Sequence, residues 1–239
     1  MENSYRIAKV FSNTPIGERV FHLVLSGEWQ GKPGQFYMVK VTGEGVYLPR
    51  PISIADIDED GIHFLVQRVG RGTEAMEKLR THDKVELLGP LGNGFSKPQG
   101  KCAMVAGGIG LAPFLYYAKT HPGQTLFAGF RSGSYFLESF KPFTDEIRVS
   151  TDDGSVGEKG SVLDLIDLSH YDRLVLCGPE PMMNAALRRF EPSKLELSLE
   201  SRMACGIGAC LGCSIETREG MRRVCHEGPV FTGDMLCWK

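Results

Sequence analysis

Two patterns of apolar and polar residues divide the chain. In the first hundred residues, short β-rich runs are separated by turns that contain glycine, proline or aspartate. Strands at this spacing predict a small antiparallel β-barrel. Residues 73–80 predict instead a short helix, with Thr73 as its N-cap. The predicted strands are residues 19–25, 34–41, 52–54, 62–67 and 84–88, and the turns between them include residues 27, 33–34, 43–45, 60–61 and 89–90.

The second pattern begins near residue 101, where the apolar runs lose their polar breaks. Such runs alternate with helical stretches that reach about Lys119 and Phe190, which predicts a parallel sheet covered by helices on both faces. The fold class is therefore mixed β and α/β. The continuous runs are residues 101–106, 125–130, 146–150 and 173–177.

These patterns predict three parts in a chain of 239 residues, a length that fits two compact domains and a small module. We assign residues 1–97 to the barrel, residues 98–194 to the α/β domain and residues 195–239 to a module that contains most of the cysteines. Residues 89–98, rich in glycine and proline, are the predicted hinge between the two domains.

Composition narrows the class of protein. Hydrophobic residues make up 42% and charged residues 23%, as in ordinary soluble globular proteins. A formal net charge of −2 gives no electrostatic case for binding nucleic acid or an anionic membrane. No apolar run approaches the roughly 20 residues that span a bilayer, and the N-terminus does not resemble a signal peptide. The expected location is a reducing cytoplasm.

The cysteines carry the strongest chemical signal. Cys205, Cys210 and Cys213 follow the spacing C-x4-C-x2-C, and eleven residues separate Cys213 from Cys225. This is the spacing expected of a [2Fe–2S] cluster of the plant-ferredoxin type. Glycine permits the tight wrapping that such a loop needs, because it tolerates positive φ and lets N–H groups approach a buried anion. The glycines of this loop are Gly206, Gly208 and Gly212.

Other interpretations of the cysteines remain open from spacing alone. A structural zinc site also uses four thiolates, although usually as two short pairs set well apart. Disulfides are disfavoured by the odd count of seven cysteines. Cys237 competes with Cys225 as the fourth ligand. Cys102 and Cys177 border apolar runs and are interpreted as buried structural thiols.

A nucleotide-binding signal lies in the second domain. Gly107, Gly108 and Gly110 follow a predicted strand, and Pro113 lies near the start of the helix that comes next. Such a turn brings N–H groups and a positive helix end to a diphosphate. An ordinary strand-to-helix turn is the alternative. A second strand ends in Cys177-Gly178-Pro179 before another helix, and ligands bind at such carboxyl edges.

The barrel contains the segment Arg50-Pro51-Ile52-Ser53. In a strand Ser53 faces away from Ile52 and Ile54, so its hydroxyl can meet a flat ligand while the isoleucines enter the core. Arg50 supplies a planar fork suited to phosphate oxygens. Gly72 and Thr73 begin the short predicted helix, whose N-terminus suits a diphosphate. A solvated arginine and a plain turn are the alternative interpretation.

In this order, the motifs resemble the ferredoxin–NADP reductase superfamily. Together with the cysteine module, the whole chain is similar to the electron-transfer subunits of B-type dihydroorotate dehydrogenases. Further segments that match these subunits are residues 89–95, 151–155, 200–205 and 224–231.

The resemblance implies that the barrel holds FAD and that the sheet domain receives NAD as its substrate. It implies that Arg50 faces the FAD diphosphate, that Ser53 lies near the reactive edge of the flavin, and that Gly72 and Thr73 close on the diphosphate. An aromatic residue of the wider superfamily is replaced here by Ile52. The resemblance also selects Cys225 over Cys237 as a cluster ligand. The residues implied to line the flavin are Gln67, Arg68 and Val69.

The implied reaction passes electrons between NAD, FAD and the cluster, with the flavin dividing a hydride pair into single electrons. The partner is a catalytic subunit that contains FMN and oxidises dihydroorotate in pyrimidine biosynthesis, in a heterotetramer with two copies of each subunit. The chemistry belongs to the cofactors, so no side chain is assigned a catalytic role. A docking face near the cluster is expected to be bordered by Arg202, Arg218, Arg222 and Arg223, although a solvated charged hairpin is the alternative interpretation of these arginines. Apolar residues expected to contribute to the face are Met221, Phe231, Leu236 and Trp238.

Three other functions remain as alternatives. One is the FAD/[2Fe–2S] subunit of an NAD(P)H:ferredoxin oxidoreductase or of a complex like sulfide dehydrogenase. Another is a reductase that works alone with a soluble acceptor. The third is a nucleotide-binding regulatory protein with a zinc module. Arg131 and Ser132 follow a predicted strand where such groups favour a 2′-phosphate, whereas the resemblance favours NAD.

Overall fold

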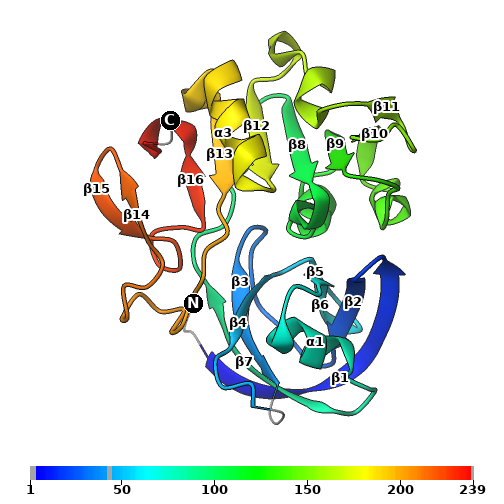
Figure 1. The fold of residues 1–239 in the computed structure, drawn as a ribbon, viewed down its shortest axis with the longest axis vertical. Coiled ribbons are helices and arrows are strands. Elements are labelled where there is room, and N and C mark those ends of the chain that lie inside the picture. Colours follow the sequence, from blue (N-terminus) through cyan, green and yellow to red (C-terminus); the bar gives the residue numbers. More distant parts are fainter. Residues whose placement is uncertain (1–3, 42–44, 238–239) are drawn as a thin grey trace.

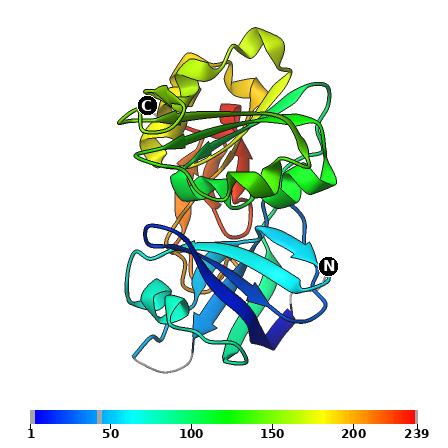
Figure 2. The same ribbon diagram turned by 90° about the vertical axis from the view of Figure 1, so that its right-hand side faces the viewer.

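The structure is a computed structural model, and it describes residues 4–41 and 45–237. Residues 43–44 of one predicted turn and Trp238 of the predicted docking face lie outside the described residues. A barrel and a twisted sheet are stacked on each other, and the C-terminal segment runs along the side of both (Figure 1). The view turned by 90° shows the sheet and its helices above the barrel (Figure 2).

The barrel is an antiparallel sheet in the order β4-β3-β7-β1-β2-β6-β5. Its two edges are joined by residues 54–55 between β4 and β5, because Ile54 N–H donates to Gln35 O (3.0 Å) and Ala55 N–H donates to His63 O (2.9 Å). The predicted antiparallel barrel is confirmed. Its strands are β1 (Ser4–Gly17), β2 (Val20–Leu25), β3 (Phe36–Val41), β4 (Arg50–Ser53), β5 (Asp56–Asp58), β6 (Gly61–Gln67) and β7 (Lys84–Leu91).

The helix of the barrel differs from the prediction at both ends. Helix α1 spans Arg71–Glu77, and its N-cap is Gly70 rather than Thr73. Thr73 lies inside the first turn, where its hydroxyl accepts hydrogen bonds from Val69 N–H (2.9 Å) and Gly70 N–H (3.2 Å). The predicted N-cap was wrong because a threonine hydroxyl can close the turn from within the helix as well as from its cap.

The second sheet has the order β11-β10-β9-β8-β12-β13-β16 and is parallel except for the β13–β16 pair. Every residue of β8 is buried, and alternate side chains go to opposite faces. Met104 packs in the cluster that contains α2, and Val105 packs in the cluster that contains α3. A parallel sheet covered on both faces is therefore confirmed, because such strands need apolar residues at every position.

The strands of this sheet are β8 (Cys102–Gly107), β9 (Gln124–Phe130), β10 (Thr144–Thr151), β11 (Glu158–Lys159), β12 (Arg173–Cys177), β13 (Leu195–Ser198) and β16 (Val230–Thr232). The α-helices that cover it are α2 (Phe114–Thr120) and α3 (Glu180–Arg189). Short 3₁₀ turns are η1 (Gly108–Leu111), η2 (Leu137–Phe140), η3 (Val162–Leu165), η4 (Leu168–His170), η5 (Pro192–Lys194) and η6 (Gly233–Met235).

The cysteine module is joined to this sheet. Strand β13 pairs with β12, and β16 returns to pair with β13 from the far end of the module. Between them lie the cysteine loop and a hairpin of β14 (Ser214–Thr217) and β15 (Gly220–Arg223). The boundaries at residues 97/98 and 194/195 stay predictions, although the parallel sheet continues across the second.

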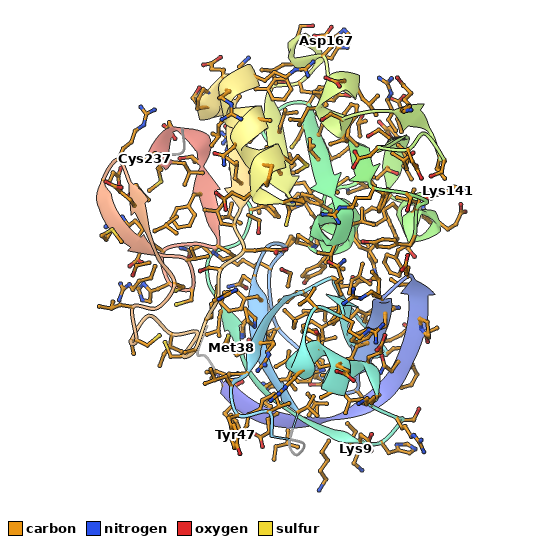
Figure 3. The ribbon with its side chains drawn as sticks, in the orientation of Figure 1. Lys9, Met38, Tyr47, Lys141, Asp167 and Cys237 are labelled. Carbon is orange, nitrogen blue, oxygen red and sulfur yellow. The ribbon has the colours of Figure 1, made fainter. Side chains whose placement is uncertain are left out.

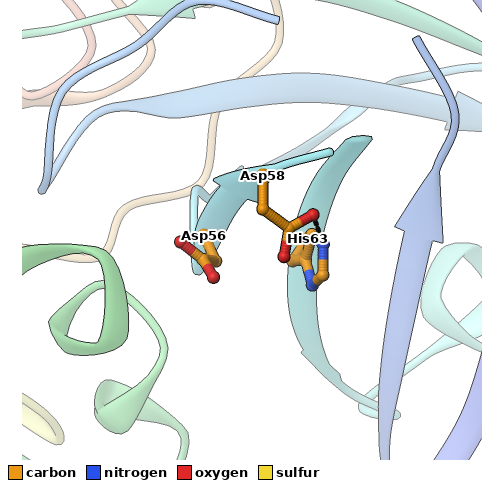
Figure 4. Close-up of side chains that lie close together, drawn as sticks. All are labelled: Asp56, Asp58 and His63. Atoms are coloured by element: carbon orange, nitrogen blue, oxygen red, sulfur yellow. Dashed lines mark hydrogen bonds and ion pairs between the residues drawn. The ribbon is translucent and has the colours of Figure 1, made fainter. Parts of the chain in front are cut away.

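A polar network ties the barrel to α2. Lys119 Nζ on α2 pairs with the buried Asp56 Oδ2 on β5 (2.5 Å). Beside it, His63 contacts Asp58 Oδ1 through Nε2 (2.8 Å) and His22 Nε2 through Nδ1 (3.1 Å). Figure 4 shows the two aspartates and His63 together. Asp56 is already paired with Lys119, and His63 is already paired with His22. We therefore interpret the cluster as a structural link between the domains.

Candidate functional site

One cleft of about 710 Å³ lies where the barrel, the parallel sheet and the segment after β13 meet. This segment, residues 198–203, supplies part of the wall and leads directly to Cys205. The cleft thus brings together predicted residues from both domains. Those that line it are Arg50, Pro51, Ile52, Ser53, Gln67, Val69, Thr73, Pro113 and Cys177.

Arg50 and Gly72, predicted to act on the same diphosphate, are in contact. The Arg50 guanidinium lies so close to Gly72 that a Cβ added to this glycine would collide with it. The guanidinium donates to the carbonyl of Leu48 rather than to a carboxylate, so its charge is not neutralised by that bond. A guanidinium with no carboxylate partner beside the first turn of α1 fits a phosphate group.

The side chains next to Arg50 follow the predicted alternation. Ile52 packs against the barrel core and Ile54 is buried within it, while Ser53 lines the cleft. Val69 lines the cleft with a side chain that is 73% exposed, an apolar surface that a flat ring would cover. Arg68 instead pairs with Glu77 (3.3 Å) and does not line the cleft.

The two glycine motifs of the sheet domain touch each other. Strands β8 and β12 are neighbours, with Ala106 beside Cys177 in register. A Cβ on Gly110 would lie 2.7 Å from Gly178 N, and one on Gly107 would lie 2.7 Å from Pro179 Cδ. These contacts require glycine at positions 107 and 110. At Gly108, with φ +55°, no atom lies within 4 Å of the place that a Cβ would occupy. Backbone at this edge can therefore approach a nucleotide closely.

Sequence reasoning gave no role to Glu200, which faces into the cleft. It carries the only carboxyl group among the described residues of the lining. Although its side chain is accessible from the cleft, the surrounding protein desolvates it and raises its pKa. Burial, with the nearby Glu200 charge, also raises the pKa of Cys177. The signals in the sequence were the position of Glu200 five residues before Cys205 and its place at the start of segment 200–205, which entered the resemblance without a role for this residue.

The four predicted cluster ligands come together in two pairs. Cys210 N–H points at Cys205 Sγ (3.5 Å), and Cys225 N–H points at Cys213 Sγ (3.4 Å). The pairs are linked by Gly208 N–H, which donates to Cys225 Sγ (3.1 Å). Burial would raise the pKa of Cys205, but N–H groups aimed at its sulfur lower it to about 6. Burial, and then the neighbouring Cys213, raise the pKa of Cys225 to about 12, so the loop favours a thiolate at Cys205 but not at Cys225.

The spacing of the sulfurs fits two metal ions better than one. Four thiolates around a single zinc at about 2.3 Å would lie about 3.8 Å apart. Among the residues that the structure describes, no three cysteine sulfurs lie within 4.8 Å of one another. Two pairs of thiolates suit a cluster in which each iron takes two cysteines. The residues present therefore fit a [2Fe–2S] cluster.

The loop lies against the barrel, and Cys237 lies elsewhere. A Cβ on Gly206, at φ +73°, would lie 2.9 Å from Met38 Sδ on β3. Figure 3 shows Met38 beside this loop and Cys237 at the other end of the module, near the parallel sheet. The structure thus brings Cys225, and not Cys237, to the other three thiols.

Exposed apolar side chains surround the loop. Ile207 is 48% exposed, Leu211 62% and Met221 63%, and Cys210 is also exposed. Phe231 and Leu236 are each only 3% exposed, so their predicted part in the docking face is wrong. Both side chains pack in the core between the sheet and the module, a burial that their isolated positions in the sequence do not indicate.

Comparisons with known proteins point to one family. A family model described as the iron–sulfur cluster binding domain of dihydroorotate dehydrogenase B matches residues 200–237. The electron transfer subunit of dihydroorotate dehydrogenase B (NAD(+)) from Clostridium acetobutylicum is 41% identical and covers 99% of this chain and 98% of its own. The subunit of that name from Clostridium perfringens is 38% identical, with 98% of each chain covered.

Solved structures share the fold. An NADH-dependent reduced ferredoxin–NADP oxidoreductase, studied for flavin-based electron bifurcation, has a TM-score of 0.86 at 28% identity and covers 98% of this chain and 90% of its own. The ferredoxin reductase of carbazole 1,9a-dioxygenase has a TM-score of 0.70 at 22% identity, with coverages of 82% and 69%. Among the described residues, no helix has the length and apolarity needed to cross a bilayer.

Proposed function

The chain belongs to the family of electron-transfer subunits of dihydroorotate dehydrogenase B, and we propose that it carries electrons between the FMN of a catalytic subunit and NAD. FAD and a [2Fe–2S] cluster are its cofactors, as the fold and the family model indicate. One observation carries the proposal: the wall of the cleft continues from Glu200 directly into the cluster loop at Cys205. This continuity of the wall with the loop supports electron exchange between a flavin in the cleft and the cluster.

The flavin supplies the exchange between paired and single electrons when it is bound. Arg50 and the backbone at Gly72 hold its diphosphate, and Ser53 meets the edge of its ring. Backbone at Gly107, Gly108 and Gly110 holds the NAD diphosphate, with Pro179 and Cys177 at the neighbouring strand end. These roles are supported by the contacts Arg50–Gly72 and Gly110–Gly178.

Glu200 is proposed to donate the proton that the reaction needs. Single electrons arrive from the cluster without protons, whereas a hydride leaves toward NAD, so one proton must enter for every two electrons. Glu200 is the one described carboxyl group of the cleft, and desolvation by the surrounding protein raises its pKa, which favours the protonated carboxyl group. We therefore add it to the site as a proton donor.

The preference for NAD is supported by the loop after β10. Asp152 N–H donates to Phe130 O (3.1 Å) and Asp153 N–H donates to Arg131 O (3.3 Å). Two acidic residues are thus tied beside Arg131 and Ser132, the positions that suit a 2′-phosphate. Their negative charge opposes that phosphate and favours NAD.

The partner is proposed to dock over the cluster loop. Ile207 and Leu211 are exposed apolar side chains of this loop, and the charged Arg202 precedes it in sequence. An electron acceptor must approach the cluster here, and an apolar centre with a charged rim suits a stable interface. Two copies of each subunit and a cytoplasmic location complete the proposal.

Copurification from the native source tests the function. We expect a stoichiometric flavoprotein partner, bound FAD, and visible bands of an iron–sulfur cluster in the complex. The complex should reduce NAD when dihydroorotate is added. A complex that instead reduces ferredoxin with NAD(P)H, and does not respond to dihydroorotate, would favour the ferredoxin oxidoreductase alternative. A colourless preparation that contains zinc would contradict both.

A further inference from the structure

Arg223, the last residue of β15, folds back onto the cluster loop. Its Nη1 donates to Gly208 O (3.0 Å). Gly208 N–H donates to Cys225 Sγ (3.1 Å). Both backbone polar groups of this glycine are therefore fixed, one by the arginine and one by a cluster ligand. The expected role of Arg223 in the rim of a docking face does not account for this contact.

Glu227 holds the arginine in this orientation. Its Oε2 accepts from Arg223 N–H (2.7 Å) and from Arg223 Nε (3.1 Å), and its Oε1 pairs with Nη2. Within the same turn, the N–H groups of His226 and Glu227 donate to Arg223 O (3.0 and 2.9 Å). Cys225 lies in the middle of this turn.

The arginine reaches the backbone around the sulfurs, with its positive charge largely offset by the paired Glu227 carboxylate. The reduced form of a cluster carries one more negative charge than the oxidised form. N–H donors and cations near the sulfurs therefore stabilise the reduced form more and raise the reduction potential.

From these contacts we infer that Arg223 is a positioning residue that sets the reduction potential of the cluster. It fixes the Gly208 N–H···Sγ bond to Cys225, and Glu227 orients its guanidinium for this contact. The inference deepens the proposed function and rests on it, because it requires a bound cluster. It is independent of the identity of the electron acceptor.

The test compares Arg223→Gln and Arg223→Lys in the intact protein. Arg222→Gln is the matched control, since Arg222 is the preceding arginine of the hairpin and pairs with Glu219 (3.1 Å). Iron and acid-labile sulfide are counted first, and the potential is then measured by a redox titration followed by EPR. Pulsed EPR of ¹⁵N-labelled protein reports the coupling of Gly208 N to the reduced cluster.

We expect Arg223→Gln to lower the reduced-to-oxidised ratio at fixed potential about tenfold, which is about 59 mV for a one-electron couple. Arg223→Lys keeps the positive charge but lacks the planar guanidinium that reaches Gly208 O. It should lower the potential less than Arg223→Gln does, and it should weaken the coupling of Gly208 N to the cluster. Arg222→Gln should match the wild type in both measurements.

The inference is overturned if both Arg223 variants contain full iron and sulfide and titrate at the wild-type potential. It is also overturned if both fail to bind the cluster while Arg222→Gln binds it, because Arg223 would then serve folding alone. A wild-type protein that binds no iron would instead contradict the proposed function, so the two failures are distinct.

Discussion

The nucleotide cleft and the cluster loop are built in different ways. The cleft is walled by regular strands and by glycines that are fixed through close backbone contacts, as at Gly110 and Gly178. The cluster loop has few buried side chains between Cys205 and Gly212, and N–H···S bonds bring its thiols together. The comparison teaches that packing alone forms the cleft before any cofactor binds. The conformation of the loop depends instead on the metal cluster that its sulfurs bind.

Removing a cluster ligand should give the largest difference between the two regions. In Cys210→Ser we expect the cluster to be lost and dihydroorotate-dependent NAD reduction to fall below detection, while bound FAD remains, because Cys210 does not line the cleft. Iron, sulfide and flavin analysis checks this. Cys237→Ser is the control, and it should behave as the wild type. Loss of FAD together with the cluster would show that the two regions form one unit.

Glu200→Gln tests the cleft wall that leads to the loop. Losing the proton donor should slow NAD reduction about 100-fold and flatten the dependence of the rate on pH, with FAD and iron content unchanged. Rates measured across the pH range check this. Glu59→Gln, at an exposed turn of the barrel, is the control. An unchanged rate and pH profile in Glu200→Gln would remove Glu200 from the site.

Acid should destabilise the barrel through His22, on strand β2. Burial first, and then the neighbouring His63, lower its pKa from 6.5 to about 4. The unfolded chain binds this proton below pH 6.5 and the folded chain does not, so stability is full above pH 6.5 and falls as the pH drops toward 4.

The expected loss is about 2 kcal/mol. It should disappear in His22→Asn but persist in His170→Asn, whose histidine is exposed. Chemical unfolding at several pH values, with flavin release as the signal, checks this. Equal acid sensitivity of the wild type and His22→Asn would contradict it.

Gly72→Ala should give the smallest effect, confined to the flavin. The new Cβ would displace the Arg50 guanidinium, and we expect FAD to bind about tenfold more weakly, about 1.4 kcal/mol. Gly70→Ala is the control, because a Cβ there meets nothing within 4 Å. FAD titration of the apoprotein measures both variants. If Gly72→Ala and Gly70→Ala bound FAD with equal affinity, Arg50 would not contact the FAD diphosphate.

The sequence predicted the regular parts of the fold and the residues of the motifs. Continuous apolar runs such as 101–106 identified the parallel strands, because both faces of that sheet are buried. Strand β1 was missed, since in its 14 residues only Ala8 and Val10 are buried and the rest carry no alternating pattern. Phe231 was misassigned for the opposite reason, because its short strand is buried by partners distant in sequence.

Within the site, spacing predicted the cysteines, and the order of motifs predicted the residues of the cleft. The sequence could not predict Glu200, because an isolated acidic residue has no pattern and acquires its role only from the walls around it. Arg223 was likewise seen only as part of a charged hairpin, since its contact with Gly208 depends on the fold of the turn around Cys225.

The central claim is that a two-iron centre in the loop exchanges single electrons with a flavin in the cleft. Protein prepared without oxygen and mixed with NADH tests it most directly, with iron and acid-labile sulfide counted beforehand. We predict that the flavin bleaches and that the EPR signal of a reduced [2Fe–2S] cluster then appears. Absence of iron and sulfide, or iron that NADH never reduces while the flavin bleaches, would contradict the claim.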